Sequence, residues 1–195
     1  SLQDAKLFVN PEAPPIQGEP LEALVVAYMA LLQTLAESQR KYPEELSMAL
    51  VRLDKLTPER MSDEVAMQQW AQSLVDLLCQ SLDANPKVEV TLDTETNAYV
   101  PKITLLLKGV AREIALPLTF LSGREYKGIA AMIDQVQDLL EPGAYVQRGE
   151  RRLDVEHFAE AFDWLQKEAR RGIDLQRYKG LGEMNPEQLW DCLLY

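Results

Sequence analysis

The hydrophobic pattern of this chain changes its period near Asn85-Pro86, and this change constrains the fold more than any other feature. Before this point, apolar residues recur at helical spacing through Leu21 to Lys41 and again through Val65 to Leu82. After it, apolar and polar residues alternate from Val88 to Leu92, as they do in a half-buried strand. The pattern therefore predicts a helical N-terminal part followed by a sheet.

Further elements follow from local signals, and each is expected at a definite place in the chain. The predicted strands are Ala5 to Val9, Ile103 to Leu107, Ile114 to Leu118 and Ala144 to Val146, and the predicted helices are Glu44 to Val51 and Arg124 to Leu140. Pro43 forces a break before the first of these helices, and Thr57-Pro58 and Ser62-Asp63-Glu64 are further helix-start signals. Two of these strands are joined around Gly109, and so short a connection favours an antiparallel sheet. The predicted fold class is α+β.

The clearest predicted helix runs from Asp154 to Gly172. Asp154 is a favourable N-cap residue, and Leu153 and Phe158 stand where two apolar side chains pack across a helix start. Gly172 is a natural C-terminal stop, and Arg170 and Arg171 in the last turn favour the helix dipole.

Composition excludes several classes of protein. The chain has 195 residues, 47% of them apolar and 26% charged, which is typical of one globular domain or a domain with an appendage. The two cysteines do not suggest a disulfide framework, so we expect a cytoplasmic protein in which Cys79 is buried. We expect no apolar run to approach the roughly 18–20 residues that a membrane span needs. One histidine and two cysteines do not suggest a zinc site, and no catalytic set stands out.

Charge is informative because it is uneven. The net charge is −11, so duplex DNA would repel the chain at long range and any nucleic-acid contact requires a local basic patch. Such a patch is predicted from seven cations, which are Arg148, Arg151, Arg152, Arg170, Arg171, Arg177 and Lys179. If the fold gathers them, they could hold phosphates without reading sequence. The simpler alternative is that Arg170 and Arg171 only satisfy a helix end and pair with nearby acids.

The stretch from Gln176 to Trp190 has a distinctive composition. Ile173 to Tyr178 is predicted to be a strand, with Lys179 at its end. Gly180 and Gly182 are predicted to form a loop hinge, because glycine permits backbone angles that a side chain would block. A capped helix is expected to follow.

This stretch resembles the segment that closes the TOPRIM domain in the B subunit of bacterial DNA gyrase. The runs Gln147 to Arg152 and Trp164 to Gly172 are similar to the sequence that precedes it in Gram-negative gyrases. The resemblance implies three regions. Residues 1–19 would be a TOPRIM-flanking strand and linker, 20–145 the inserted domain, and 146–195 a return helix with the closing TOPRIM strand and loop.

The resemblance also implies a function. The parent enzyme uses ATP to pass one DNA duplex through another, and it works with the gyrase A subunit and the rest of the B subunit. The acidic motifs that hold Mg²⁺ in that family and its ATPase domain do not appear here, so Mg²⁺ and ATP are expected in the parent subunit and no cofactor in this chain. The chain is expected to be architectural, supporting the DNA-cleavage core and the DNA path.

Two other hypotheses stay open from the residues. The chain could be a free-standing interaction module that binds gyrase or a regulator. It could also be an independent acid–base enzyme, which would require a pocket of convergent carboxylates with shifted pKa values.

Overall fold

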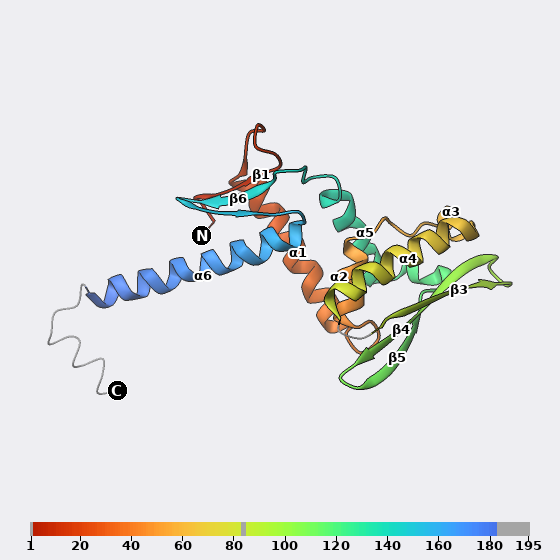
Figure 1. Cartoon of the computed structure of the whole chain (residues 1–195). Helices are drawn as coiled ribbons and strands as arrows, with labels where there is room; N and C mark the ends of the chain where they lie inside the picture. The colour runs from red at the N-terminus through yellow and green to blue at the C-terminus, as the bar shows by residue number, and fades with distance from the viewer. Residues whose placement is uncertain (1, 83–84, 183–195) are drawn as a thin grey trace, which may run out of the picture. The chain divides into compact units, whose positions relative to one another are not determined.

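In this computed structural model the described residues are 2–82 and 85–182, and side chains are described as far as Gly172. Within these ranges the chain forms six α-helices and two antiparallel sheets, which confirms the α+β class (Figure 1). The chain divides into two compact units. One comprises residues 1–25 and 139–195, and the other comprises residues 26–138. Each unit is described separately below.

The first unit is built on a four-stranded sheet with the order β2-β1-β6-β7. Its strands are β1 (Ala5–Phe8), β2 (Ile16–Gln17), β6 (Tyr145–Arg148) and β7 (Arg151–Asp154). Helix α6 (Phe158–Gly182) contacts β6. Alternating residues of the sheet, such as Leu7 and Val146, are fully buried, as are Ala161 and Leu165 on α6. Burial of these two apolar faces against each other stabilises the unit.

The second unit packs helices on a three-stranded antiparallel sheet with the order β3-β4-β5. The strands are β3 (Lys87–Asp93), β4 (Ala98–Leu107) and β5 (Val110–Ala115), and the helices are α2 (Glu44–Val51), α3 (Pro58–Met61), α4 (Glu64–Ser81) and α5 (Arg124–Val136). Figure 1 shows α4 beside this sheet, and α3 and α4 contact its strands. Ile103 and Leu105 on β4 and Leu74 on α4 are completely buried in the core.

Helix α1 (Glu19–Glu37) runs through the boundary between the two units. Among the described residues, α1 is the one helix that has both the length and the hydropathy needed to cross a membrane. By these two criteria, the expectation that no apolar run approaches a membrane-spanning length is wrong. Its buried residues recur every three or four positions, which is typical of a helix with one face in a core. They are Leu21, Val25, Tyr28, Leu31 and Leu35.

Most predicted helices of the second unit are confirmed, because their start signals act locally. Helix α2 has the predicted bounds and follows Pro43 directly. The side chains of Thr57 and Asp63 accept hydrogen bonds from backbone N–H groups at the starts of α3 and α4. The predicted strand Ile114 to Leu118 ends early, because β5 stops at Ala115 and residues 118–122 form a 3-10 helix after Pro117.

The prediction for Asp154 to Gly172 is wrong at both ends. Asp154 belongs to β7, helix α6 begins at Phe158, and Leu153 is 39% exposed. The helix starts later than predicted because Arg151–Asp154 pair with β6 in a β-hairpin. In the turn of this hairpin Gly149 adopts a positive φ of 61°, and Arg148 pairs with Arg151.

The strand predicted for Ile173 to Tyr178 is also wrong, as is the loop at Gly180 and Gly182, because α6 continues as a helix to Gly182. A strand needs a neighbouring strand to satisfy its backbone hydrogen bonds, whereas a helix satisfies them internally. The expected burial of Cys79 is wrong as well, since it is exposed on α4. The capped helix predicted to follow, which would begin near Pro186, lies outside the described residues.

Candidate nucleic-acid interface

The β6–β7 hairpin divides its arginines between its two faces. Arg148 and Arg151 are opposite each other in the register and therefore share one face, which is directed at α6. Arg152 lies on the other face, where its guanidinium carbon is 3.6 Å from the centre of the Tyr145 ring. The Tyr145 ring is in turn stacked on Phe8 at 4.4 Å between centroids. Arg152 also pairs with Asp154 at 3.2 Å. Its guanidinium is thus fixed by a cation–π contact and an ion pair.

Glu168 on α6 organises the face that carries Arg148 and Arg151. This residue is only 7% exposed. Its carboxylate accepts a hydrogen bond from Arg151 Nη1 at 2.8 Å, and Arg171 Nη1 lies 3.7 Å from the same oxygen. A buried carboxylate requires such compensation, because removing a charge from water is costly.

Arg148 completes this arrangement by contacting the backbone of α6. Its Nη1 donates a hydrogen bond to the Glu168 carbonyl oxygen at 2.5 Å. A Cβ atom at position 172 would lie 3.2 Å from Arg148 Nη2, so Gly172 leaves the space that the guanidinium occupies. We call Arg148, Arg151, Glu168 and Arg171 the Glu168 cluster. It contains three guanidinium groups and one carboxylate.

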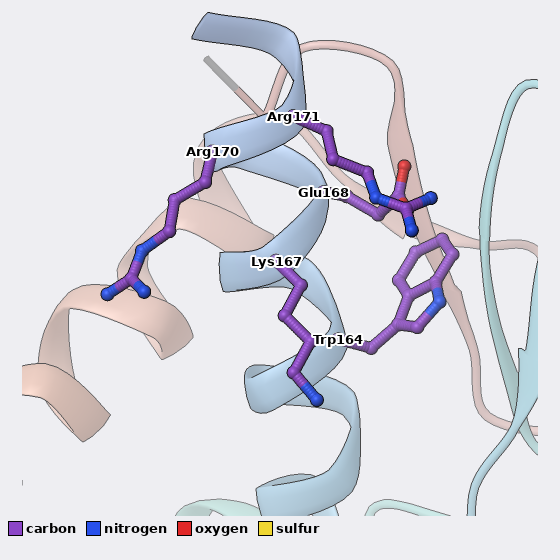
Figure 2. Close-up of a pocket in the computed structure, with 5 residues that line it drawn as sticks. All are labelled: Trp164, Lys167, Glu168, Arg170 and Arg171. Atoms are coloured by element: carbon purple, nitrogen blue, oxygen red, sulfur yellow. The ribbon is translucent and has the colours of Figure 1, made fainter. Parts of the chain in front are cut away.

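An open depression of about 390 Å³ adjoins this cluster on α6. It is lined by Trp164, Lys167, Glu168, Arg170 and Arg171. Figure 2 shows the Arg171 guanidinium beside Glu168 and above the Trp164 indole, whereas Arg170 points to the opposite side of the helix. A surface of this kind has an aromatic floor and several cationic donors, which suits an anionic group better than a neutral one.

The structure therefore gathers some of the seven predicted cations and separates others. Arg148, Arg151 and Arg171 meet at Glu168, and Arg152 lies on the opposite face of the hairpin. Arg170 lines the depression with Arg171, but its guanidinium is directed away from Glu168 (Figure 2). Arg177 and Lys179 fall on helical backbone whose side chains lie outside the described residues. The DNA-contact role of all seven stays a prediction.

Sequence reasoning missed Trp164, Lys167 and Glu168. Trp164, Glu168 and Arg171 recur at positions i, i+4 and i+7, which places them on one side of a helix. This spacing could have identified the group. The burial of Glu168 could not have been read from it, because the residues that cover the carboxylate come from a hairpin that was not predicted.

The described residues offer little for other chemistry. Within 2–82 and 85–182, no group of three or more His, Cys, Asp or Glu side chains is placed to hold a metal ion. The carboxylates of Asp93 and Glu125 have lowered pKa values, first because backbone N–H groups donate to them. Asp93 lies at a turn and Glu125 lies at the start of α5, so neither carboxylate lines the depression at α6. That depression is lined by one carboxylate, Glu168.

Comparison with known proteins places the chain in context. Residues 5–169 match the DNA gyrase B subunit insert domain, and residues 170–194 match the carboxyl terminus of the DNA gyrase B subunit. The B subunit of DNA gyrase from Myxococcus xanthus is 57% identical over 47 residues, which are 24% of this chain and 6% of that protein. The B subunit of DNA topoisomerase 4 from Staphylococcus aureus is 44% identical over 64 residues, 31% of this chain and 10% of that protein.

A third relative is the B subunit of the type 2 topoisomerase from Aquifex aeolicus, which is 49% identical over 44 residues, 23% of this chain and 6% of that protein. The chain thus aligns with 6% to 10% of the length of these three curated relatives. The insert-domain match, by contrast, covers residues 5–169 of the 195. This chain therefore belongs to the family of DNA gyrase B subunit insert domains.

Proposed function

We propose that this chain acts as an architectural segment in the B subunit of a type IIA DNA topoisomerase, where it supports the DNA-cleavage core and lines part of the DNA path. The Glu168 cluster is the observation that carries this proposal. It lies at the end of the insert-domain match and presents fixed cations on an otherwise acidic chain.

The cluster has donors left for a phosphate backbone. Its single carboxylate offsets one of three guanidinium groups, and the side chains of Arg151 and Arg171 are 55% and 61% exposed. An arginine has five N–H donors in a planar fork, so one hydrogen bond to Glu168 leaves others available. Contacts of this kind position a duplex without reading its sequence.

We further propose that the chain has no catalytic activity alone and that the parent subunit is cytoplasmic. Mg²⁺ and ATP would be held by other segments of that subunit, because the described residues do not provide the carboxylate set that Mg²⁺ requires. The purified chain is expected to neither nick DNA nor hydrolyse ATP, and turnover in either assay would refute this part of the proposal.

The DNA contact is tested by removing one charge in a full-length B subunit that carries this sequence. Arg171→Gln is expected to weaken DNA binding and to reduce the slope of log affinity against log salt by about one phosphate contact. Lys127→Gln removes the same charge from an exposed residue of α5 and serves as the control. Equal effects of the two variants would mean that Arg171 does not touch DNA.

The architectural role is tested by deleting residues 20–145 from the same subunit and measuring supercoiling and DNA-stimulated ATP hydrolysis separately. Loss of supercoiling with retained ATP hydrolysis is expected, since the deletion removes a support and leaves the ATPase domain. Normal values for both activities would show that the segment supports neither the core nor the DNA path.

A further inference from the structure

Strand β3 forms an edge of the β3-β4-β5 sheet, and neither a proline nor a bulge interrupts that edge. Within the part of the chain that the structure describes, β3 pairs with β4 alone, in an unbroken register from Lys87 opposite Thr104 to Asp93 opposite Ala98. The strand has seven residues and contains no proline or bulge. Proteins often protect an edge of this length with one of these two features, because the free N–H and C=O groups can pair with another strand.

The apolar face of β3 is also incompletely covered. Val88 and Val90 are half-buried and Leu92 is 46% exposed. On the neighbouring strand β4, Ile103 and Leu105 are fully buried. An additional strand beside β3 would remove the remaining apolar surface of these three residues from water, which is favourable.

We propose that β3 pairs antiparallel with β3 of a second copy of this chain, about a two-fold axis at Val90, to give a continuous six-stranded sheet. In this register Val90 lies opposite its own counterpart and Val88 lies opposite Leu92, both on the apolar face. Glu89 lies opposite Thr91 and Lys87 lies opposite Asp93, both on the polar face. The proposal does not rest on the function proposed above.

Charge selects this register over its neighbours. Sliding the second copy by two residues in one direction places Glu89 opposite itself, and sliding it in the other direction places Glu89 opposite Asp93. Like charges directly opposite each other are destabilising, whereas Lys87 opposite Asp93 is attractive. The Asp93 carboxylate is held in place, since it accepts hydrogen bonds from Glu95 N at 3.0 Å and from Thr96 Oγ1 at 2.9 Å.

The other edge of the same sheet behaves differently. Strand β5 carries Arg112 and Glu113 at its centre. A two-fold axis at either residue places identical charges opposite each other, so β5 disfavours pairing with itself. The sheet therefore has one self-complementary edge and one edge that serves as an internal control.

The proposal is tested by measuring the monomer–dimer equilibrium of the whole chain by sedimentation. Lys87→Glu faces Asp93 of the second copy and is expected to raise the dimer dissociation constant by about fivefold, because both symmetric charge pairs change sign. Thr91→Lys faces Glu89 and is expected to lower the constant by a similar factor. Ala111→Lys on β5 makes a comparable change at the other edge and is expected to leave it unchanged.

Cross-linking checks the register independently. In a background with Cys79 and Cys192 replaced by serine, Glu89→Cys and Thr91→Cys are expected to form a disulfide with each other when the two proteins are mixed, and much less when each is oxidised alone. A shifted register would reverse this result, since it would place residue 89 or residue 91 opposite its own copy.

Two outcomes would overturn the proposal. One is a chain that stays monomeric at concentrations up to about 1 mM, where even a weak dimer would be populated. The other is a dimer whose dissociation constant does not respond to Lys87→Glu or Thr91→Lys, which would locate the interface on a different surface. Circular dichroism of each variant establishes that the fold is retained.

Discussion

At the scale of single residues, the most informative side chain is Glu168, because it is a buried carboxylate among exposed arginines. Its burial is tolerated only while Arg151 and Arg171 remain beside it. The same contacts fix the guanidinium groups that the proposed DNA contact uses. Stability and positioning are therefore linked at this residue.

Replacing Glu168 with glutamine tests that link. Glu168→Gln keeps the shape of the side chain and one acceptor but removes the charge. We expect the free energy of unfolding to fall by about 1 kcal/mol. The effect is this small because both arginines are more than half exposed, so water screens their attraction to the carboxylate. Urea denaturation measures the change. Glu160→Gln alters an exposed residue of the same helix and should stay within about 0.5 kcal/mol of the unsubstituted chain. An equal effect of both substitutions would show that the cluster contributes nothing to stability.

Tyr126 is a second residue whose chemistry can be predicted from its surroundings. Its hydroxyl oxygen accepts a buried hydrogen bond from Leu56 N at 2.5 Å. Burial raises the pKa of the phenol above its ordinary value of 10.0, although the bond from Leu56 acts in the opposite direction. As the pH rises past about 10, the unfolded chain loses this proton first, so the folded state becomes less stable relative to it.

Tyr126→Phe is therefore expected to have two effects. At neutral pH it should lower the free energy of unfolding by about 1–2 kcal/mol, because the buried Leu56 N–H loses its acceptor. Between the ordinary and the raised pKa, the difference between the two proteins should shrink, since the variant has no phenol to ionise. Denaturation curves across the alkaline range measure this. A difference that stays constant with pH would contradict the assignment.

At the scale of elements, sequence reasoning succeeded where a signal and its structural effect lie close together. Pro43, Thr57 and Asp63 each fix a helix start within a few residues, and Gly109, with a φ of 78°, stands in the predicted β4–β5 turn. It failed where the outcome depends on a distant neighbour. The pattern from Ile173 to Tyr178 alternates like a strand, yet alternation alone provides no strand to pair with.

The β6–β7 hairpin shows a different kind of failure. Gly149-Glu150 is a two-residue turn, but the flanking residues are charged and do not alternate with apolar ones, so the sequence does not show the two strands on either side of it. That omission had a consequence for the site. Without the hairpin, its arginines could not be assigned to opposite faces, and their division between Glu168 and Tyr145 was not foreseen.

At the scale of the whole molecule, the main question is whether the two units unfold together. Each has its own sheet and its own buried apolar residues, which favours separate cooperative units. Helix α1 runs through the boundary between them and could couple their unfolding. One substitution in each unit distinguishes these possibilities.

Gly143→Ala perturbs the first unit. Gly143 has a φ of 87°, and an added Cβ would lie 2.9 Å from the Pro11 ring, so both backbone strain and a clash oppose the change. Gly149→Ala, at a φ of 61° with open space around it, imposes strain without the clash and is the matched control. We expect Gly143→Ala to reduce amide exchange protection more than the control does, and only in the unit formed by 1–25 and 139–195.

Tyr126→Phe is the reciprocal change, and its loss of protection should be confined to residues 26–138. Hydrogen exchange followed by mass spectrometry of peptides measures both variants in one experiment. The peptides of α1 provide the most sensitive readout, because its two ends belong to different units. If either substitution lowers protection equally throughout the chain, α1 transmits the destabilisation and the two units unfold as one.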